Sequence, residues 1–259
     1  MNRSAMLAAA LAACALTCHQ GVAAEAAVAR PGAAFPKGHY AALDRLPDWG
    51  GVWVVTRPKP VPGAAPAEPP KLKGDYLARY QVWLKDTQEH HGVARKETSN
   101  CTPPGMPGMM GSAQYPIEFL FTPGRVTTLH EAWMQTRTIF TDGRGHPDDQ
   151  DPGFFGHSIG HWEGDTLVVE TVGIKTITEL AAGMKHSAGL KVLERIHLAK
   201  GDNATLLDEM TMEDPDALAV PYHRTITFQR QRDWNLMEFV CAENDRNPVG
   251  ADGITRLVE

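Results

Sequence analysis

Histidines, carboxylates and an arginine gather in one glycine-rich stretch of the chain, residues 141–170. The stretch reads TDGRGHPDDQDPGFFGHSIGHWEGDTLVVE. Its ionisable members are Asp142, Arg144, His146, Asp148, Asp149, Asp151, His157, His161, Glu163, Asp165 and Glu170. A histidine beside a carboxylate can hold a pKa near neutrality and move a proton. The stretch therefore predicts acid–base chemistry on a small organic molecule, of the lyase, isomerase or hydrolase type.

Four residues of this stretch are the catalytic candidates: His157, His161, Asp142 and Arg144. In a strand, His157, Ile159 and His161 share one face, and the residues between them share the other. An inward histidine near Asp142 could transfer protons, and Arg144 could hold a substrate carboxylate with two parallel hydrogen bonds. The structural alternative is that the Asp and Gly residues here only build turns.

Five further residues are candidates for contacting a ligand: His146, Trp162, Glu170, Arg137 and Met106. Each has a structural alternative. An arginine can pair with a nearby carboxylate such as Asp142, Asp148 or Glu131, and a methionine often fills a gap in a core. We expect these residues to contact a small-molecule ligand or substrate.

A metal site is the second alternative, because His157 and His161 lie four residues apart. On a helix that spacing places two ligands on one face, but a strand separates them by about 13 Å. A metal ion would then need a bend at Gly160 or help from His146, His186 or Asp151. No metal or cofactor is therefore assigned. The sequence GHSIG has the G-x-S-x-G form of a nucleophile elbow, but a hairpin follows it where the elbow needs a helix.

The elements that must position these residues are mostly strands. Short runs with β-branched residues and turn signals between them predict strands at 49–56, 117–122, 125–133, 136–141, 158–162, 166–172, 192–199, 205–213, 223–230 and 235–242. Such a meander favours a mainly β fold, a single antiparallel, barrel-like domain over residues 49–259. A barrel suggests the first alternative function, a non-catalytic, lipocalin-like binder of an apolar or aromatic ligand.

One amphipathic helix is expected beside the barrel, at residues 75–91. Its apolar stripe consists of Tyr76, Leu77, Tyr80, Trp83, Leu84 and Thr87, at spacings of three and four residues. We expect this helix to cover one end of the barrel or to pack outside it.

The N-terminal 24 residues have the form of a signal peptide. Arg3 precedes an apolar run that is too short to span a bilayer, and Ala23-Ala24 offers a cleavage site. The alternative is a lipoprotein whose first residue is a lipidated Cys14. Both predict export to the periplasm or beyond, with residues 25–48 as an extended lead-in. The net charge of -6 argues against a nucleic-acid partner, and no later segment is apolar enough for a membrane helix.

Two cysteines remain in the mature chain, Cys101 and Cys241. In an oxidising compartment such a pair most simply forms a disulfide. A zinc site would need histidine partners near the cysteines, and neither cysteine has one close in sequence.

Several motifs together resemble a large, mostly uncharacterised family of exported bacterial proteins. They are C-x-P-x-GMP from Cys101, TDGR-x-HP from Thr141, GHSIG-x-WEGDTLVV from Gly156 and C-x-EN from Cys241. The resemblance covers nearly everything after Trp49. It implies export, a Cys101–Cys241 bridge and a β-rich, lipocalin-like body, and it supplies no catalytic residues.

Overall fold

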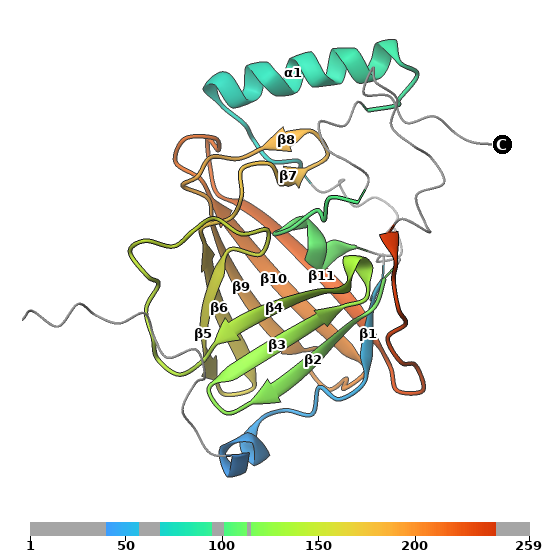
Figure 1. The fold of residues 1–259 in the computed structure, drawn as a ribbon, viewed down its shortest axis with the longest axis vertical. Coiled ribbons are helices and arrows are strands. Elements are labelled where there is room, and N and C mark those ends of the chain that lie inside the picture. Colours follow the sequence, from blue (N-terminus) through green and yellow to red (C-terminus); the bar gives the residue numbers. More distant parts are fainter. Residues whose placement is uncertain (1–39, 57–67, 95–100, 113–114, 242–259) are drawn as a thin grey trace, which may run out of the picture. The chain divides into compact units, whose positions relative to one another are not determined.

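Nine strands close into a β-barrel in the computed structural model, which describes residues 40–56, 68–94, 101–112 and 115–241 (Figure 1). All of these residues belong to one compact unit that begins at Gly32. The barrel strands are β1 (Val52–Thr56), β2 (Ile117–Thr122), β3 (Arg125–His130), β4 (Gln135–Phe140), β5 (His157–Glu163), β6 (Thr166–Val172), β9 (Lys191–Leu198), β10 (Thr205–Glu213) and β11 (Tyr222–Gln231). The predicted mainly β, barrel-like fold is confirmed.

The strands follow the order β1-β11-β10-β9-β6-β5-β4-β3-β2 around the barrel, and β2 pairs with β1 to close it. Every neighbouring pair is antiparallel except β4 and β5, which run parallel with Ile139 opposite Ser158. The expectation of a wholly antiparallel barrel is wrong at this pair. The chain between Phe140 and His157 crosses back before β5 begins, so β5 runs in the same direction as β4. This long connection carries much of the candidate stretch.

Buried residues alternate with more exposed ones along the strands, and the buried residues face the inside of the barrel. In β6, Leu167, Val169 and Thr171 are buried, and the residues between them are half-buried. Strands β9 and β10 alternate in the same way, as expected for strands with one face on a core. Fully buried Trp53 and Phe228 occupy the interior.

A methionine-rich segment lies at one end of the barrel, between the strands and the small sheet β7–β8 (Figure 1). Met106, Met109 and Met110 are fully buried there, around the 3-10 helix η2 (Gly108–Gly111). The backbone N–H of Met106 donates to the carbonyl of Phe154, at 2.8 Å, which ties the segment to the connection before β5. Met106 therefore fills the core, which was the structural alternative for this residue.

The predicted helix forms as α1 (Gly74–Glu89), close to the expected residues 75–91. It has no buried residue, and it lies on the side of β7 (Glu179–Ala181) and β8 (Met184–Lys185) away from the barrel strands (Figure 1). The half-buried Trp83 contacts Gly183 between β7 and β8, and Tyr80 stacks on Trp83 with ring centroids 5.8 Å apart. No helix in the described ranges is long and apolar enough to cross a membrane.

Several expected boundaries are wrong. The strand expected at 125–133 ends at His130, because Trp133 and Met134 adopt positive φ angles of 54° and 47° in η3 (Ala132–Met134). Residues 235–241 form no strand, because β1 and β11 already have neighbours on both edges of a closed barrel. The lead-in contains a 3-10 helix, η1 (Tyr40–Arg45), and the short sheet β7–β8 was not predicted. The signal peptide and Cys14 lie outside the described residues.

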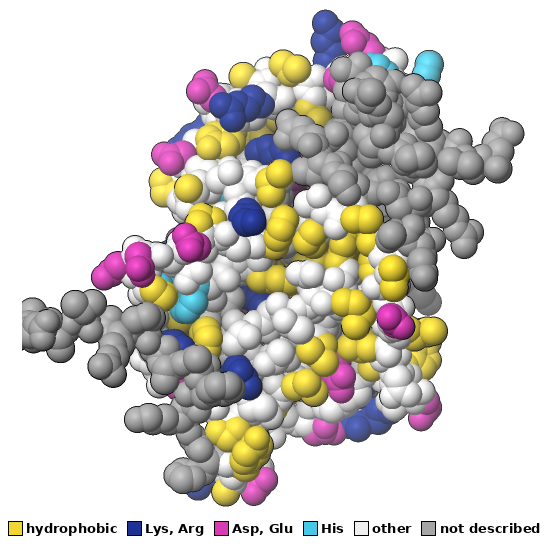
Figure 2. All heavy atoms as spheres, in the orientation of Figure 1, with side chains coloured by type: hydrophobic (Ala, Val, Ile, Leu, Met, Phe, Trp, Pro, Cys, Tyr) yellow, Lys and Arg dark blue, Asp and Glu magenta, His cyan; other side chains and the backbone are white. Residues whose placement is uncertain are grey.

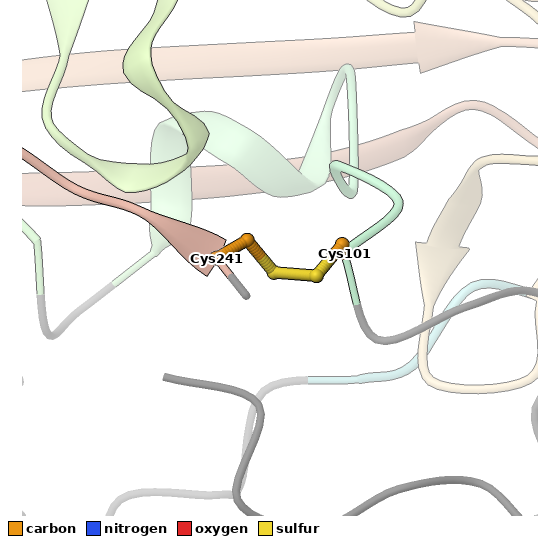
Figure 3. Close-up of a disulfide and its surroundings, with 2 residues drawn as sticks. All are labelled: Cys101 and Cys241. Atoms are coloured by element: carbon orange, nitrogen blue, oxygen red, sulfur yellow. A yellow bond between two sulfur atoms is a disulfide. The ribbon is translucent and has the colours of Figure 1, made fainter. Parts of the chain in front are cut away.

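The disulfide between Cys101 and Cys241 is confirmed (Figure 3). Its sulfur atoms are 2.15 Å apart and its Cα atoms 5.5 Å apart, across 140 residues of sequence. The bond joins the start of the methionine-rich segment to the chain that follows β11. It therefore fastens the segment that lies at the barrel end to a distant part of the same unit.

Candidate functional site

Strand β5 divides the candidate residues between the two sides of the barrel wall. Its alternation is as predicted, but the face that points inward carries Ser158, which is buried, together with Gly160 and Trp162. His157 and His161 lie on the outer face. The possibility of an inward histidine on this strand is therefore not realised for either of them.

Arg137 lies buried in the barrel interior, where three side chains accept its hydrogen bonds. Its Nη1 and Nη2 atoms donate to the two carboxylate oxygens of Glu194, the first at 2.8 Å. Its Nε atom donates to Oγ of Ser158 at 3.1 Å, and Nη2 also donates to Oγ1 of Thr171 at 2.7 Å. These bonds use four of the five N–H donors of the buried guanidinium and leave one N–H of Nη1. We call Arg137, Glu194, Ser158 and Thr171 the interior polar cluster.

Asp208 lies beside this cluster with no exposed surface, and neither of its carboxylate oxygens has a hydrogen-bond partner among the described residues. Burial raises the pKa of Asp208 well above its usual range. The charge of Glu194 adds to the rise, and those of Arg137 and Arg224 oppose it. Because an unpaired buried carboxylate is costly, this environment favours the protonated form of Asp208.

His130 is a second buried titratable group inside the barrel. Its Nε2 atom lies 2.9 Å from Oγ1 of Thr128, and its Nδ1 atom has no partner among the described residues. Burial, followed by the charge of Arg137, lowers the pKa of His130 to about 3. The ring is therefore neutral across the physiological range.

Outside the barrel, the connection between β4 and β5 folds back so that His146 meets β5 and β6. The Nδ1 atoms of His146 and His157 are 2.8 Å apart, a hydrogen-bond distance. On the other side of its ring, Nε2 of His146 lies 3.3 Å from Oε1 of Glu170, an ion-pair distance without the alignment of a hydrogen bond. Oε2 of Glu170 accepts from Nζ of Lys191 at 3.0 Å. We call His146, His157 and Glu170 the outer histidine cluster.

Aromatic and ionic contacts fix this cluster to the wall. The ring of Phe140 stacks on His157 at 5.4 Å, and the guanidinium of Arg144 lies 3.9 Å from the centroid of Phe140. Arg144 also donates to both oxygens of Asp142, at 2.9 and 2.7 Å. Asp142 and Arg144 thus pair with each other, as the structural alternative held, and border the outer histidine cluster.

Both histidines of the cluster are weaker bases than free imidazole. Burial is the main cause that lowers the pKa of His146, and the charge of Glu170 partly opposes it. Burial also lowers the pKa of His157, helped by the charges of His146 and Arg144. At neutral pH both rings are therefore uncharged, and one Nδ1 atom must donate to the other.

His161 lies apart from this cluster. Its side chain is 64% exposed, and Nε2 lies 3.2 Å from Oε1 of Glu163, which also pairs with Arg195 at 2.9 Å. The two histidines of β5 therefore do not converge on one point, and within the described ranges no group of three potential metal ligands comes together. The expected combination of His157 and His161 at one metal ion has no support in this geometry.

A third candidate site lies next to Trp162, near the η1 end of the barrel. The ring of Trp162 packs against Trp49 and Phe121 with centroids 5.3 Å from each. Trp49 and Phe121 line a pocket of about 460 Å³ between η1, the residues just before β1, and β2. The lining residues are Leu43, Leu46, Pro47, Asp48, Trp49, Gly50, Phe119, Leu120, Phe121 and Thr122. We call this the Trp49 pocket.

The Trp49 pocket has an apolar lining with few polar groups. Figure 2 shows hydrophobic side chains at the surface around η1 and the neighbouring end of β2, and Leu120 at the rim is 40% exposed. Trp49 is buried, and its indole N–H has no acceptor among the described residues. Asp48 is held by Arg232 and Arg230, and the hydrogen bond from Arg232 is the main cause that lowers its pKa to about 2.

Comparison with known proteins adds no family assignment, since no protein-family model matches the chain and no curated protein matches it.

The residues missed from the sequence are those of the interior, Glu194 and Asp208 above all. The alternation of apolar residues in β9 and β10 could have indicated both of them. Glu194 stands in phase with Val192 and Ile196, and Asp208 stands in phase with apolar neighbours in β10. A charged residue at a core position of an alternating strand has to find a partner inside the barrel.

Proposed function

We propose that this chain is an exported, lipocalin-like protein that binds a small apolar or aromatic molecule in the Trp49 pocket. The observation that carries the proposal is the lining. Trp49, Phe119 and Phe121 line the pocket with aromatic rings, of which Phe121 is the least buried, and the volume of about 460 Å³ lies within the range of small-molecule sites.

A binder fits this pocket better than an enzyme does. Among the described residues that line the pocket there is no histidine, and their one ionisable side chain, Asp48, is held as an anion by two arginines. A group whose pKa is about 2 is a poor proton acceptor at neutral pH. The histidines that favoured an enzyme lie elsewhere on the barrel wall, so catalysis in this pocket has no acid or base to perform it.

Export rests on the sequence and on compatible structural features. The N-terminal residues have the form of a signal peptide, and a disulfide is usual in exported proteins. The motif resemblance to exported bacterial proteins supports the same reading. Membership of that family is part of the proposal.

The test uses a fluorescent aromatic probe, 1-aminoanthracene, titrated into the mature protein. We expect saturable binding with quenching of tryptophan emission, because Trp49 and Trp162 lie at the pocket. Phe121→Ala removes one aromatic wall and should weaken binding about tenfold, the effect of losing roughly 1.4 kcal/mol of contact.

The matched control is Val82→Ala in α1, which truncates an exposed apolar side chain far from the pocket in the chain and outside its lining. This variant should bind the probe as the parent does. Equal affinity in Phe121→Ala and the parent, with both folded by circular dichroism, would exclude the Trp49 pocket as the binding site.

A further inference from the structure

The outer histidine cluster lies on a different part of the wall from the Trp49 pocket and has its own chemistry. Its hydrogen-bond chain can be assigned from one end. A carboxylate oxygen 3.3 Å away stabilises a proton on the ring nitrogen that faces it, so Nε2 of His146 carries the proton although this contact lacks hydrogen-bond alignment. His146 is uncharged, so its Nδ1 atom carries none and has to accept from Nδ1 of His157.

The same rule fixes the tautomer of His157. Because its Nδ1 atom donates to His146, the Nε2 atom of a neutral His157 carries a bare lone pair. Nε2 has no hydrogen-bond partner among the described residues and is absent from their buried, unpaired atoms. It therefore faces solvent as a base, and the rest of its ring is held by Phe140 and His146.

We infer that Glu170, His146 and His157 form a proton relay that makes His157 a general base for hydrolysis of small activated esters. Nε2 of His157 takes a proton from a water molecule as the water oxygen attacks the ester carbonyl carbon. The bond from that carbon to the leaving oxygen then breaks, and the imidazolium returns its proton to the leaving alcohol or to solvent. The products are the carboxylic acid and the alcohol.

In the relay, neighbouring groups stabilise the protonated form of His157, a stabilisation that an isolated surface histidine does not have. When Nε2 takes a proton, the positive charge on His157 is shared through the Nδ1–Nδ1 hydrogen bond, and Glu170 stabilises it from the far side of His146. The charged groups that face the pair are Glu170 of β6, Lys191 of β9, and Arg144 with Asp142 from the connection. Arg144 pairs with Asp142, whereas Glu170 faces Lys191 with Oε2 and His146 with Oε1.

The neighbourhood of His157 fits an ester with an apolar acyl group. Phe140 stacks on the imidazole, and Val172 lies directly opposite His157 in the pairing of β5 with β6. Both side chains are half-buried on the outer face. An apolar acyl chain can lie along this surface and bring its carbonyl carbon to a water molecule held at Nε2.

The experiment measures p-nitrophenyl acetate hydrolysis by the mature protein as a function of pH. We expect a rate that rises with pH and levels off below the ordinary titration range of histidine. His157→Gln should lower the rate by about 100-fold, the scale for losing a positioned base. Glu170→Gln should lower it by a smaller factor and move the pH profile, an effect that a purely structural role would not produce. His161→Gln, on the same strand and outside the cluster, should match the parent.

A second measurement needs no variant. Nitrogen-15 NMR of the histidine side chains distinguishes the two neutral tautomers, and His157 should carry its proton on Nδ1. A proton on Nε2 of His157 would overturn the relay, and so would a parental rate in His157→Gln. Failure of probe binding in the Trp49 pocket would leave this result untouched, because the two sites share no residue.

Discussion

Asp208 is a residue whose protonation the barrel controls through burial. Its raised pKa means that the folded protein holds a proton that the unfolded chain releases near pH ~3.9. Between that pH and the folded pKa, the folded state binds more protons than the unfolded state. Stability is therefore greatest below the unfolded pKa and falls as the pH rises through the folded pKa.

Asp208→Asn should remove this loss, because asparagine has nearly the shape of the protonated acid and cannot ionise. We expect the variant to melt several degrees above the parent at pH 8, a gain of roughly 1 kcal/mol or more, and to match it near pH 4. Thermal unfolding between pH 4 and pH 8 measures the difference. Glu213→Gln, at an exposed position of the same strand, is the control and should follow the parent. A variant that loses stability mainly at pH 8 would mean that the carboxylate is ionised and paired.

At the scale of elements, α1 packs closely on the turn between β7 and β8 through Trp83. A Cβ atom on Gly183 would lie 2.3 Å from the ring of Trp83, and the φ angle of this glycine is +73°. Gly183→Ala should therefore displace the helix while the barrel stays folded. We expect trypsin to cleave at Arg79 and Lys85 about tenfold faster, because cleavage follows the population of the open helix.

Gly201→Ala provides the matched control for this prediction. Gly201 has nearly the same φ angle, +75°, and nothing lies within 4 Å of an added Cβ atom. The two variants share the backbone strain of a left-handed alanine, roughly 1–2 kcal/mol, and differ only in the contact with Trp83. Equal cleavage of the helix in both variants would show that strain alone, and not the lost contact, loosens α1.

Helices, strands and turns were predictable where the residues that determine them lie close together in the sequence. Hairpin turns such as Glu163-Gly164-Asp165 and the apolar stripe of α1 lie within a few residues, and both formed as expected. The strand expected after Arg232 failed because no barrel edge was free, and only the closed pairing of β1 with β2 and β11 determines that. Local pattern also left open which face of β5 points inward, since both faces mix apolar and polar residues.

The grouping of site residues was likewise predictable where they lie close together in the sequence, and unpredictable where they lie far apart. Asp142, Arg144, His146, His157 and Glu170 come together partly because they lie within one stretch of 30 residues, so their proximity was predictable. The partner of Arg137 was not, since Glu194 is 57 residues away and reaches it across the barrel. The Trp49 pocket joins residues before β1 to β2, and Trp162 reaches it only through the closure of the sheet.

At the scale of the whole molecule, the Cys101–Cys241 bond closes a long loop that contains eight of the nine barrel strands. In the chain-entropy model, closing a loop of this length restricts the unfolded chain enough to stabilise the fold by about 5 kcal/mol, and measured effects are commonly about 2–4 kcal/mol. The bond also anchors the methionine-rich segment at the barrel end. Its loss should therefore affect global stability and local order together.

We expect the Cys101→Ser, Cys241→Ser double variant to unfold at lower denaturant concentration than the oxidised parent, with a loss of about 2–5 kcal/mol. The reduced parent should behave like the double variant, because both lack the same cross-link. Chemical unfolding followed by tryptophan fluorescence measures all three proteins under one set of conditions.

Mass spectrometry of protein recovered from the periplasm should show the cysteines oxidised and the chain beginning at Glu25, whereas a lipidated Cys14 at the start would establish the lipoprotein alternative. Two free thiols in that material, or an unchanged unfolding midpoint in the double variant, would contradict a stabilising disulfide.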